Sequence, residues 1–301
     1  MSDLSSPAPH PTAAAAPHAR AAARSFFTVR DLTPTLGAEI IGVDLTQPIP
    51  PDVFKAIHDV WLEKLVILIR GPKLSQDDQV RFAELFGPLK SRTRTDAANH
   101  NKGNDAVMFV SNLRENGQLV GSHPDGEMHF HSDQSHQEKP CAATMLYAME
   151  VPSTGGNTLF ANAYYAYETL PQSVRDRIDG LRAIHAYDYE HGETRSGVVR
   201  PGVPQASHPI VRTHPETGRK ALYVSRLMTA EIEGMNTAES EELLMYLFAH
   251  IERKEFVFEH VWQREDLILW DNRCALHART DFSAAELRHM RRVTIKGEKP
   301  V

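Results

Sequence analysis

A histidine and an aspartate stand two positions apart in the segment Phe130-His131-Ser132-Asp133. The segment is typical of the end of a strand, in which residues i and i+2 point to the same face. Both side chains could therefore reach one metal ion. Two ligands do not complete a metal site, and we expect His277, which follows the apolar stretch Leu267–Trp270, to supply the third. Because the chain contains 16 histidines, the first pair alone is weak evidence.

The ligand types narrow the choice of metal. Two imidazoles and one carboxylate would leave three positions open on an octahedral ion. That arrangement suits non-haem Fe(II), which has to hold a chelating cosubstrate and O2 at the same time. Zinc prefers tetrahedral coordination and would keep one open position. Zinc hydrolases also use His and Asp, so the spacing leaves both metals open.

Cationic and hydroxyl side chains near these residues could bind an anion. Arg288, Arg291 and Arg292 follow His277, and a guanidinium can bind a carboxylate through two parallel hydrogen bonds. Arg288 and Arg292 are separated by an even number of residues, so they would share one face of a strand. Thr158 follows a Gly-Gly turn, where its hydroxyl could assist. A solvated strand edge and an ordinary strand threonine are the alternative explanations.

Short strands with a few helices must position these residues. We expect strands over 26–32, 38–45, 65–69, 108–111, 141–148, 158–160, 209–213, 220–225, 256–262, 267–271 and 291–296. We expect helices over 51–64, after a capping pair Ser75/Asp78, over 163–170 and 172–181, and after an N-cap at Thr237. This order favours a β-sandwich or barrel core decorated by helices. Residues 89–128 should be mostly loop, either a lid over the site or a variable surface loop.

Composition limits the class of protein. The chain has 301 residues, 41% hydrophobic content and a net charge of −6. No Lys/Arg block predicts nucleic-acid binding, and no apolar run approaches the roughly 18 residues of a membrane span. Two cysteines, Cys141 and Cys274, favour a reducing compartment such as the cytoplasm. Residues 1–24 should form a disordered tail, with a transit peptide as the alternative, before a single domain over 25–301.

Four motifs occur in a fixed order along the chain. They are Phe130-His131-Ser132-Asp133, Val151-Pro152 with Gly155-Gly156-Asn157-Thr158, Trp270-Asp271-Asn272-Arg273 with His277, and Arg288–Thr294. Together they resemble the taurine dioxygenase and 2,4-dichlorophenoxyacetate dioxygenase family of Fe(II)/2-oxoglutarate-dependent oxygenases. That family usually has Trp where this chain has Phe130. The resemblance extends from residue 36 to residue 297.

The resemblance implies a fold and a role for each matching residue. The fold would be α+β but mainly β, with a double-stranded β-helix (jelly-roll) core and flanking helices. His131, Asp133 and His277 would bind Fe(II). Arg292, with Thr158, would hold the distal carboxylate of 2-oxoglutarate, and Arg288 would anchor the acidic group of the primary substrate. His129 would share a strand face with His131 and could contact substrate or support a ligand.

The implied enzyme is a dioxygenase that uses Fe(II), 2-oxoglutarate and O2 to hydroxylate a small organic acid, releasing succinate and CO2. A sulfonate, a sulfate ester and an aryloxyalkanoate all remain open as substrates. A related oxygenase that tailors a natural product or an amino-acid-like intermediate is the enzyme alternative. A ligand-binding β-sandwich with structural histidines is the non-enzyme alternative, and it leaves the spaced arginines unexplained. The resemblance also implies a homodimer or homotetramer.

Overall fold

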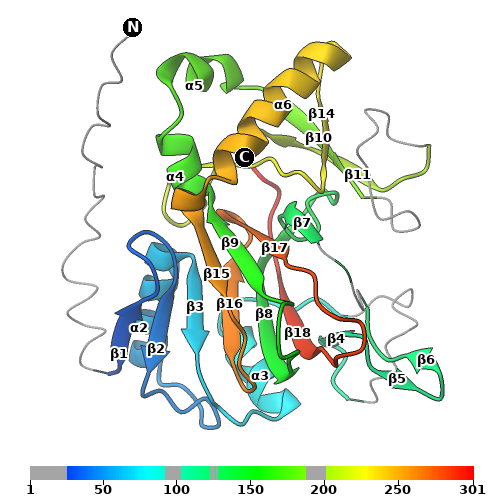
Figure 1. The fold of residues 1–301 in the computed structure, drawn as a ribbon. Helices are drawn as coiled ribbons and strands as arrows, with labels where there is room; N and C mark the ends of the chain where they lie inside the picture. Colours follow the sequence, from blue (N-terminus) through cyan, green and yellow to red (C-terminus); the bar gives the residue numbers. More distant parts are fainter. Residues whose placement is uncertain (1–25, 92–102, 123–125, 127, 188–200) are drawn as a thin grey trace, which may run out of the picture.

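Two facing β-sheets form the centre of the molecule (Figure 1). The computed structural model describes residues 26–91, 103–122, 126, 128–187 and 201–301. The large sheet has the order β1 (Thr28–Asp31), β2 (Ala38–Ile41), β3 (Val66–Ile69), β16 (Leu267–Asp271), β8 (Cys141–Glu150), β18 (His289–Lys296) and β4 (Val107–Ser111). The small sheet has the order β15 (Val257–His260), β9 (Thr158–Asn162), β17 (Ala275–Arg279) and β7 (Met128–His131).

The apolar runs of the large sheet are buried on both faces. In β3, Val66 and Leu68 belong to the hydrophobic core shared with the small sheet. Ile67 and Ile69 belong to a second core on the opposite face, which also contains Trp61. Because strand side chains alternate between faces, a continuous apolar run predicts a strand covered on both sides, as observed here.

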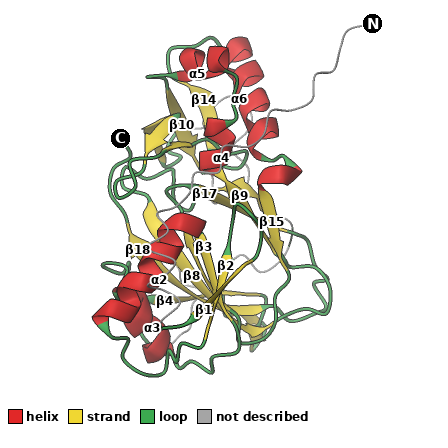
Figure 2. Cartoon of the chain, turned by 90° about the vertical axis from the view of Figure 1, so that its left-hand side faces the viewer, coloured by secondary structure: helices red, strands yellow, loops and turns green. Residues whose placement is uncertain are grey.

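Helices α2 (Pro51–Lys64) and α3 (Gln76–Glu84) cover the outer face of the large sheet (Figure 2). Pro51 stands in the first turn of α2, where its missing N–H costs no hydrogen bond. The predicted Ser75/Asp78 capping box is confirmed: the Ser75 hydroxyl accepts from the Asp78 N–H, and the Asp78 carboxylate accepts from the Ser75 N–H. Local sequence therefore fixes both helix starts.

A second group of elements lies at one end of the sheets, around the small sheet (Figures 1 and 2). It contains α4 (Ala163–Glu168), α5 (Gln172–Ile178), α6 (Thr237–Ile251), the sheet β11 (Gln205–Pro209), β10 (Arg182–Ala186) and β14 (Thr229–Ile232), and the hairpin β12 (Val211–Thr213) and β13 (Lys220–Leu222). The predicted N-cap of α6 is wrong by one position, since Asn236, and not Thr237, accepts from the Glu239 N–H.

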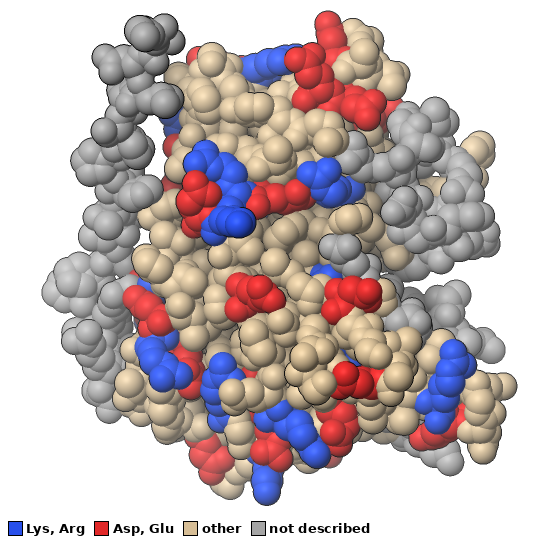
Figure 3. Space-filling model, viewed as in Figure 1, with Lys and Arg blue, Asp and Glu red and all other residues tan. Residues whose placement is uncertain are grey.

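Several elements were not expected from the sequence. They are β10, β11, β14, the hairpin β5 (Arg114–Glu115) and β6 (Gln118–Leu119), and β17, which carries His277. The expected tail over 1–24 and part of the expected loop over 89–128 lie outside the described residues. Among the described helices, none is long and apolar enough to cross a membrane. Charges of both signs are interspersed over the face shown in Figure 3.

Candidate metal centre and cosubstrate pocket

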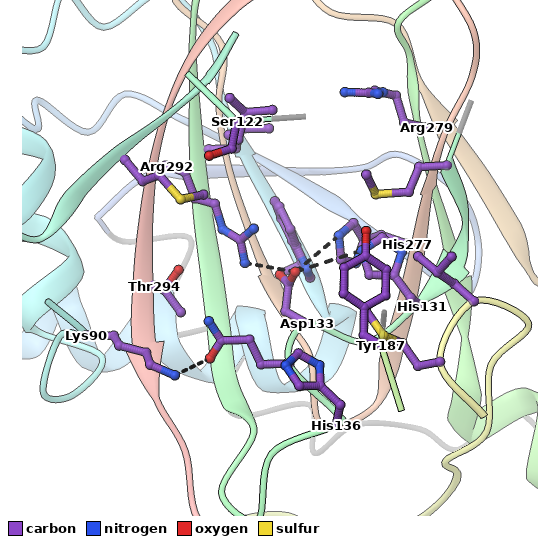
Figure 4. A pocket seen from close by; sticks show the side chains of 18 of the residues that line it. Lys90, Ser122, His131, Asp133, His136, Tyr187, His277, Arg279, Arg292 and Thr294 are labelled. Carbon is purple, nitrogen blue, oxygen red and sulfur yellow. Dashed lines mark hydrogen bonds and ion pairs between the residues drawn. The ribbon is translucent and has the colours of Figure 1, made fainter. Parts of the chain in front are cut away.

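The three predicted ligands meet between the two sheets. His131 is the last residue of β7, and His277 of β17 lies directly opposite it in the antiparallel ladder. Asp133 follows in the turn after β7. Its Oδ1 lies 3.9 Å from His131 Nε2 and 3.8 Å from His277 Nε2, and the two imidazole centroids are 4.1 Å apart. The three side chains converge on one point in Figure 4.

The protonation states at this point suit a cation. Burial lowers the pKa of His131 and, more strongly, that of His277, so both rings are neutral at pH 7. His131 Nδ1 lies 2.9 Å from the His129 carbonyl oxygen and donates to it, which leaves Nε2 as the free acceptor. Burial alone would raise the pKa of Asp133, but the charge of Arg292 and the neighbouring histidines hold it well below its ordinary value.

Hydrogen bonds from the large sheet orient the carboxylate. Thr144 of β8 donates its hydroxyl to Asp133 Oδ2 at 2.6 Å. Asn272 Nδ2 donates to the Thr144 hydroxyl at 3.0 Å, and Asn272 Oδ1 accepts from the Trp270 indole N–H at 3.0 Å. The Trp270 ring lies 4.7 Å from that of His277. The Trp-Asp-Asn-Arg motif thus supports the ligands rather than supplying one.

The donor set fits a divalent transition metal with open positions. One ligand atom from each of His131, Asp133 and His277 lies within 4.8 Å of the others, and two neutral imidazoles with one carboxylate form the set that non-haem Fe(II) uses. A second cluster in the described residues, His214, Asp271 and Cys274, has similar spacing.

This second cluster is already satisfied within the protein. Asp271 accepts from Arg273 Nε at 2.8 Å and lies 3.0 Å from His214 Nε2. His214 Nδ1 accepts the N–H groups of Glu216 and Thr217. Because both Asp271 and His214 already have partners within the protein, the cluster stabilises the β12–β13 turn instead of a metal.

A cavity of about 730 Å³ opens beside the metal ligands. It is lined by Lys90, Ser91, Ala106, Met108, Val110, Ser122, Met128, His131, Asp133, Gln134, His136, Gln137, Leu146, Thr158, Tyr187, Pro204, Leu227, Met228, Trp270, His277, Ala278, Arg279, Arg288, Arg292 and Thr294. The lining combines thioether and aliphatic surfaces with a few cations, as expected of a site for a small organic anion.

Three of the predicted anion-binding residues, Thr158, Arg288 and Arg292, line this cavity. Arg292 Nη2 lies 2.8 Å from Asp133 Oδ1. Arg288 Nε instead donates to the Gly156 carbonyl at 3.1 Å, two residues before Thr158. The Thr158 hydroxyl accepts from the Trp262 indole N–H at 3.0 Å. Burial, with the nearby charge of Arg279, lowers the pKa of Arg288 to about 9, so its guanidinium stays charged at pH 7.

Arg291 does not belong to this cationic group. Its Nη2 donates to the Leu74 carbonyl, and its guanidinium stacks over Tyr147 at 4.5 Å. The alternation of β18 sends Arg291 to the outer face of the large sheet and its neighbour Arg292 to the inner one. The cluster expected from the sequence is therefore divided between two faces.

His129 is not brought to the cavity. Its side chain is exposed, whereas Met128 and His131 both line the cavity. The cause is a β-bulge. His277 pairs with His131 and Arg279 pairs with Met128, so β7 advances by three residues over the distance in which β17 advances by two. An extra residue breaks the strict two-residue alternation, which is why the expected shared face of His129 and His131 fails.

Three residues of the site were not singled out from the sequence. Lys90 follows the Gly-Pro stop of α3, Thr144 lies mid-strand in β8, and Arg279 is two residues after His277 on β17. Only Arg279 had a usable signal, since a residue two positions from a ligand on a strand shares its face. Gln134 and His136, which follow the ligand Asp133, also line the cavity.

Comparisons with known proteins agree with this geometry. The family model described as "Taurine catabolism dioxygenase TauD, TfdA family" matches residues 28–294. An alpha-ketoglutarate-dependent 2,4-dichlorophenoxyacetate dioxygenase from Cupriavidus pinatubonensis is 33% identical over 276 residues, 87% of this chain and 95% of the relative. Pentalenolactone F synthase from Streptomyces avermitilis is 32% identical over 286 residues, 88% of this chain and 92% of the relative.

Solved structures agree as well. The crystal structure of a taurine dioxygenase from Burkholderia xenovorans matches with a TM-score of 0.78 and 30% identity, covering 92% of this chain and 91% of that one. The predicted jelly-roll core with flanking helices is thereby confirmed. The chain belongs to the TauD/TfdA family and is an α-ketoglutarate (2-oxoglutarate)-dependent dioxygenase that uses Fe(II), 2-oxoglutarate and O2.

Proposed function

We propose that this dioxygenase hydroxylates a small organic anion with an apolar body. The observation that carries the proposal is the cavity beside the converging His131, Asp133 and His277, which is apolar over much of its wall but includes cationic side chains. The relative from C. pinatubonensis is named for 2,4-dichlorophenoxyacetate, a compound of this kind. Tailoring of a natural product is the second candidate, because pentalenolactone F synthase is almost as similar.

His131, Asp133 and His277 would hold Fe(II) through Nε2, a carboxylate oxygen and Nε2. Bound there, the iron would couple oxidative decarboxylation of 2-oxoglutarate, to succinate and CO2, with insertion of one oxygen atom of O2 into a substrate C–H bond. The chain's own residues orient the reactants. Thr144 and Arg292 fix the carboxylate, and the buried Trp270 packs against His277 and excludes water from that side.

For the two arginines we propose roles that differ from those implied by the resemblance. We propose that Arg288, with Thr158, holds the distal carboxylate of 2-oxoglutarate, and that Arg292 lies beside the near carboxylate. The support is positional: Arg292 lies 2.8 Å from a metal-ligand oxygen, while Arg288 is held at Gly156, close to Thr158. A chelating cosubstrate has its near carboxylate at the metal and its distal one farther away.

A pair of cosubstrates tests this division. 2-Oxoglutarate and 2-oxovalerate share the near carboxylate and keto group, but only the first has a distal carboxylate. Their Kd values for the Fe(II) enzyme are measured anaerobically from the visible charge-transfer band. We expect Arg288→Gln to abolish the preference for 2-oxoglutarate, by roughly 10- to 100-fold, and Arg292→Gln to weaken both ligands alike. Loss of the preference in Arg292→Gln instead would restore the original assignment.

The reaction itself is tested by succinate release. The Fe(II) enzyme is incubated with 2-oxoglutarate, O2 and a panel of phenoxyacetates, alkyl sulfates, sulfonates and neutral lactones. Stimulation by the anions supports the leading proposal, and stimulation by the lactones alone supports tailoring. Succinate release by none of them, with no 2-oxoglutarate bound, contradicts both. A homodimer or homotetramer stays a prediction, which light scattering after gel filtration can check.

A further inference from the structure

The cationic side chains of the cavity are spread along one strand face. Arg288 precedes β18, and Arg292 and Thr294 line the cavity from within it. Lys90 joins the same row, because its backbone N–H donates to the Thr294 carbonyl at 2.9 Å. Six residue steps separate 288 from 294, or about 20 Å of extended chain. Lys90 and Arg288 therefore belong to opposite ends of the cavity, with Arg292 between them.

The close-up shows the part of this row that contains Lys90, Thr294 and Arg292. In Figure 4 Asp133 lies between Lys90, Thr294 and His136 on one side and Ser122 and Arg279 on the other. The Lys90 side chain points inward, toward the turn that carries Asp133.

The ammonium group of Lys90 has only neutral partners in the described part of the chain. Nζ donates to Gln134 Oε1 and, at 2.7 Å, to Gln137 Oε1. An ammonium has three N–H donors, so one remains for another acceptor. No carboxylate of the described residues forms an ion pair with it. A partly buried cation that lacks an anion is poised to accept one from a ligand.

Gln134 is itself held in an unusual conformation that aims it at Lys90. It follows Asp133 directly and has φ of 58°, in the left-handed region that non-glycine residues rarely adopt. Its Oε1 also accepts from the Cys141 thiol at 3.0 Å. The turn after the metal ligand is therefore built so that an amide oxygen positions the ammonium.

We propose that Lys90 binds the anionic group of the primary substrate and determines the enzyme's preference for acids. The inference rests on the proposed function and deepens it. If 2-oxoglutarate extends from the metal toward Arg288, the remaining space lies on the Lys90 side of the metal. Apolar residues Ala106, Met108, Leu227 and Met228 line the cavity too. The substrate that fits is a carboxylate or sulfate ester with a short apolar body. Its anionic group would lie at Lys90, and its reacting C–H bond would lie closer to the metal.

The test compares the effect of removing the positive charge of Lys90 with the effect of removing the charge of a lysine outside the cavity. The variants are Lys90→Met, Lys90→Arg and, as matched control, Lys139→Met, since Lys139 is exposed and does not line the cavity. The probes are hexyl sulfate, 2,4-dichlorophenoxyacetate and the neutral 1-hexanol. Each is titrated anaerobically into the enzyme loaded with Fe(II) and 2-oxoglutarate, and the shift of the visible band gives Kd.

We expect Lys90→Met to raise Kd for at least one anion roughly 10- to 100-fold, with the Kd of 1-hexanol and 2-oxoglutarate within about twofold. Lys90→Arg and Lys139→Met should stay close to the parent. Equal losses in Lys90→Met and Lys139→Met would overturn the proposal, as would a parent enzyme that binds neither anion more tightly than 1-hexanol. If the visible band did not form at all, the result would count against the oxygenase function. This outcome therefore distinguishes a failure of the proposed function from a failure of the Lys90 proposal.

Discussion

At the scale of single residues, the metal centre depends on hydrogen-bonding partners of the ligands as well as on the ligands themselves. Asp133 offers Oδ1 to the cavity because Thr144 binds its Oδ2 from β8 and Asn272 binds Thr144 in turn. Such outer contacts fix a ligand's orientation and its basicity. The carboxylate is thus presented by a chain of three side chains that belong to three separate segments.

Thr144→Val tests this chain of contacts. The substitution preserves the shape of the side chain and removes the hydroxyl, so Asp133 loses an orienting bond and we expect Fe(II) affinity to fall roughly 10- to 100-fold. Metal titration with a competing chelator measures it. Thr229→Val, at another buried threonine that does not contact Asp133, is the control. Equal affinities in the two variants would show that the hydroxyl has no role.

The sequence predicted the residues that lie within motifs, and the structure brings the metal ligands together as expected. Thr144 and Lys90 could not be predicted in the same way. Lys90 lies 44 positions before its partner Gln134, and Thr144 lies on the strand that follows Asp133, 11 positions further on. The role of each depends on how these segments pack against the metal ligands. That information is tertiary and leaves no local pattern.

At the scale of elements, the bulge in β7 decides which side chains enter the cavity. Because of the bulge, Met128 and not His129 lines the cavity, and the backbone carbonyl of His129 accepts a hydrogen bond from His131. A two-residue period assigned His129 to the site, because a single inserted residue is invisible to a pattern of alternation.

His129→Ala should therefore be nearly silent. The backbone carbonyl that accepts from His131 Nδ1 remains, so iron content and the Kd of 2-oxoglutarate should change less than about twofold, because exposed side chains away from a site contribute little. His131→Ala, which removes a ligand, provides the contrasting variant and should lose iron. Iron analysis after gel filtration and the anaerobic titration make the comparison. A large loss in His129→Ala would place its side chain at the site after all.

At the scale of the whole molecule, several buried histidines make stability depend on pH. Burial, assisted by the charge of Lys90, lowers the pKa of His136 to about 4, and burial also lowers the pKa of His185 and His208. Between these values and the ordinary pKa of 6.5, the unfolded chain binds more protons than the folded one. The free energy of unfolding therefore rises with pH over this window and falls on acidification.

Urea unfolding of the chelator-treated protein at pH 7, 6 and 5 measures the effect. His136 alone should contribute a loss of about 2 kcal/mol between pH 7 and pH 5, and His136→Gln should remove that part. Asp133 and Asp271, whose pKa values are lowered, lose their contribution only at more acidic pH and lie outside the window. A stability that does not change from pH 7 to pH 5 would contradict the prediction.

The density of short strands predicted a β-sandwich or barrel, and the resemblance carried by the ordered motifs implied the jelly-roll, but neither predicted how the strands pair. His277 was expected after the strand Leu267–Trp270 and instead stands on a strand of its own, β17, which the sequence did not reveal. Its short mixed pattern, Ala-Leu-His-Ala-Arg, alternates poorly because both faces are largely buried. The position of His277 beside His131 follows from the antiparallel pairing of β17 with β7.

That ladder has a consequence for how the enzyme matures. His131 and His277 are direct neighbours across two strands although 146 positions (277 − 131) separate them in the chain. Closing so long a loop has an entropic cost that must be met before the contact between the two histidines stabilises the fold. During synthesis, no iron centre can assemble until the C-terminal strands have left the ribosome. Iron would then act as a ligand of the finished fold, adding about 2.7 kcal/mol to the free energy of unfolding at a concentration of 100 times its Kd.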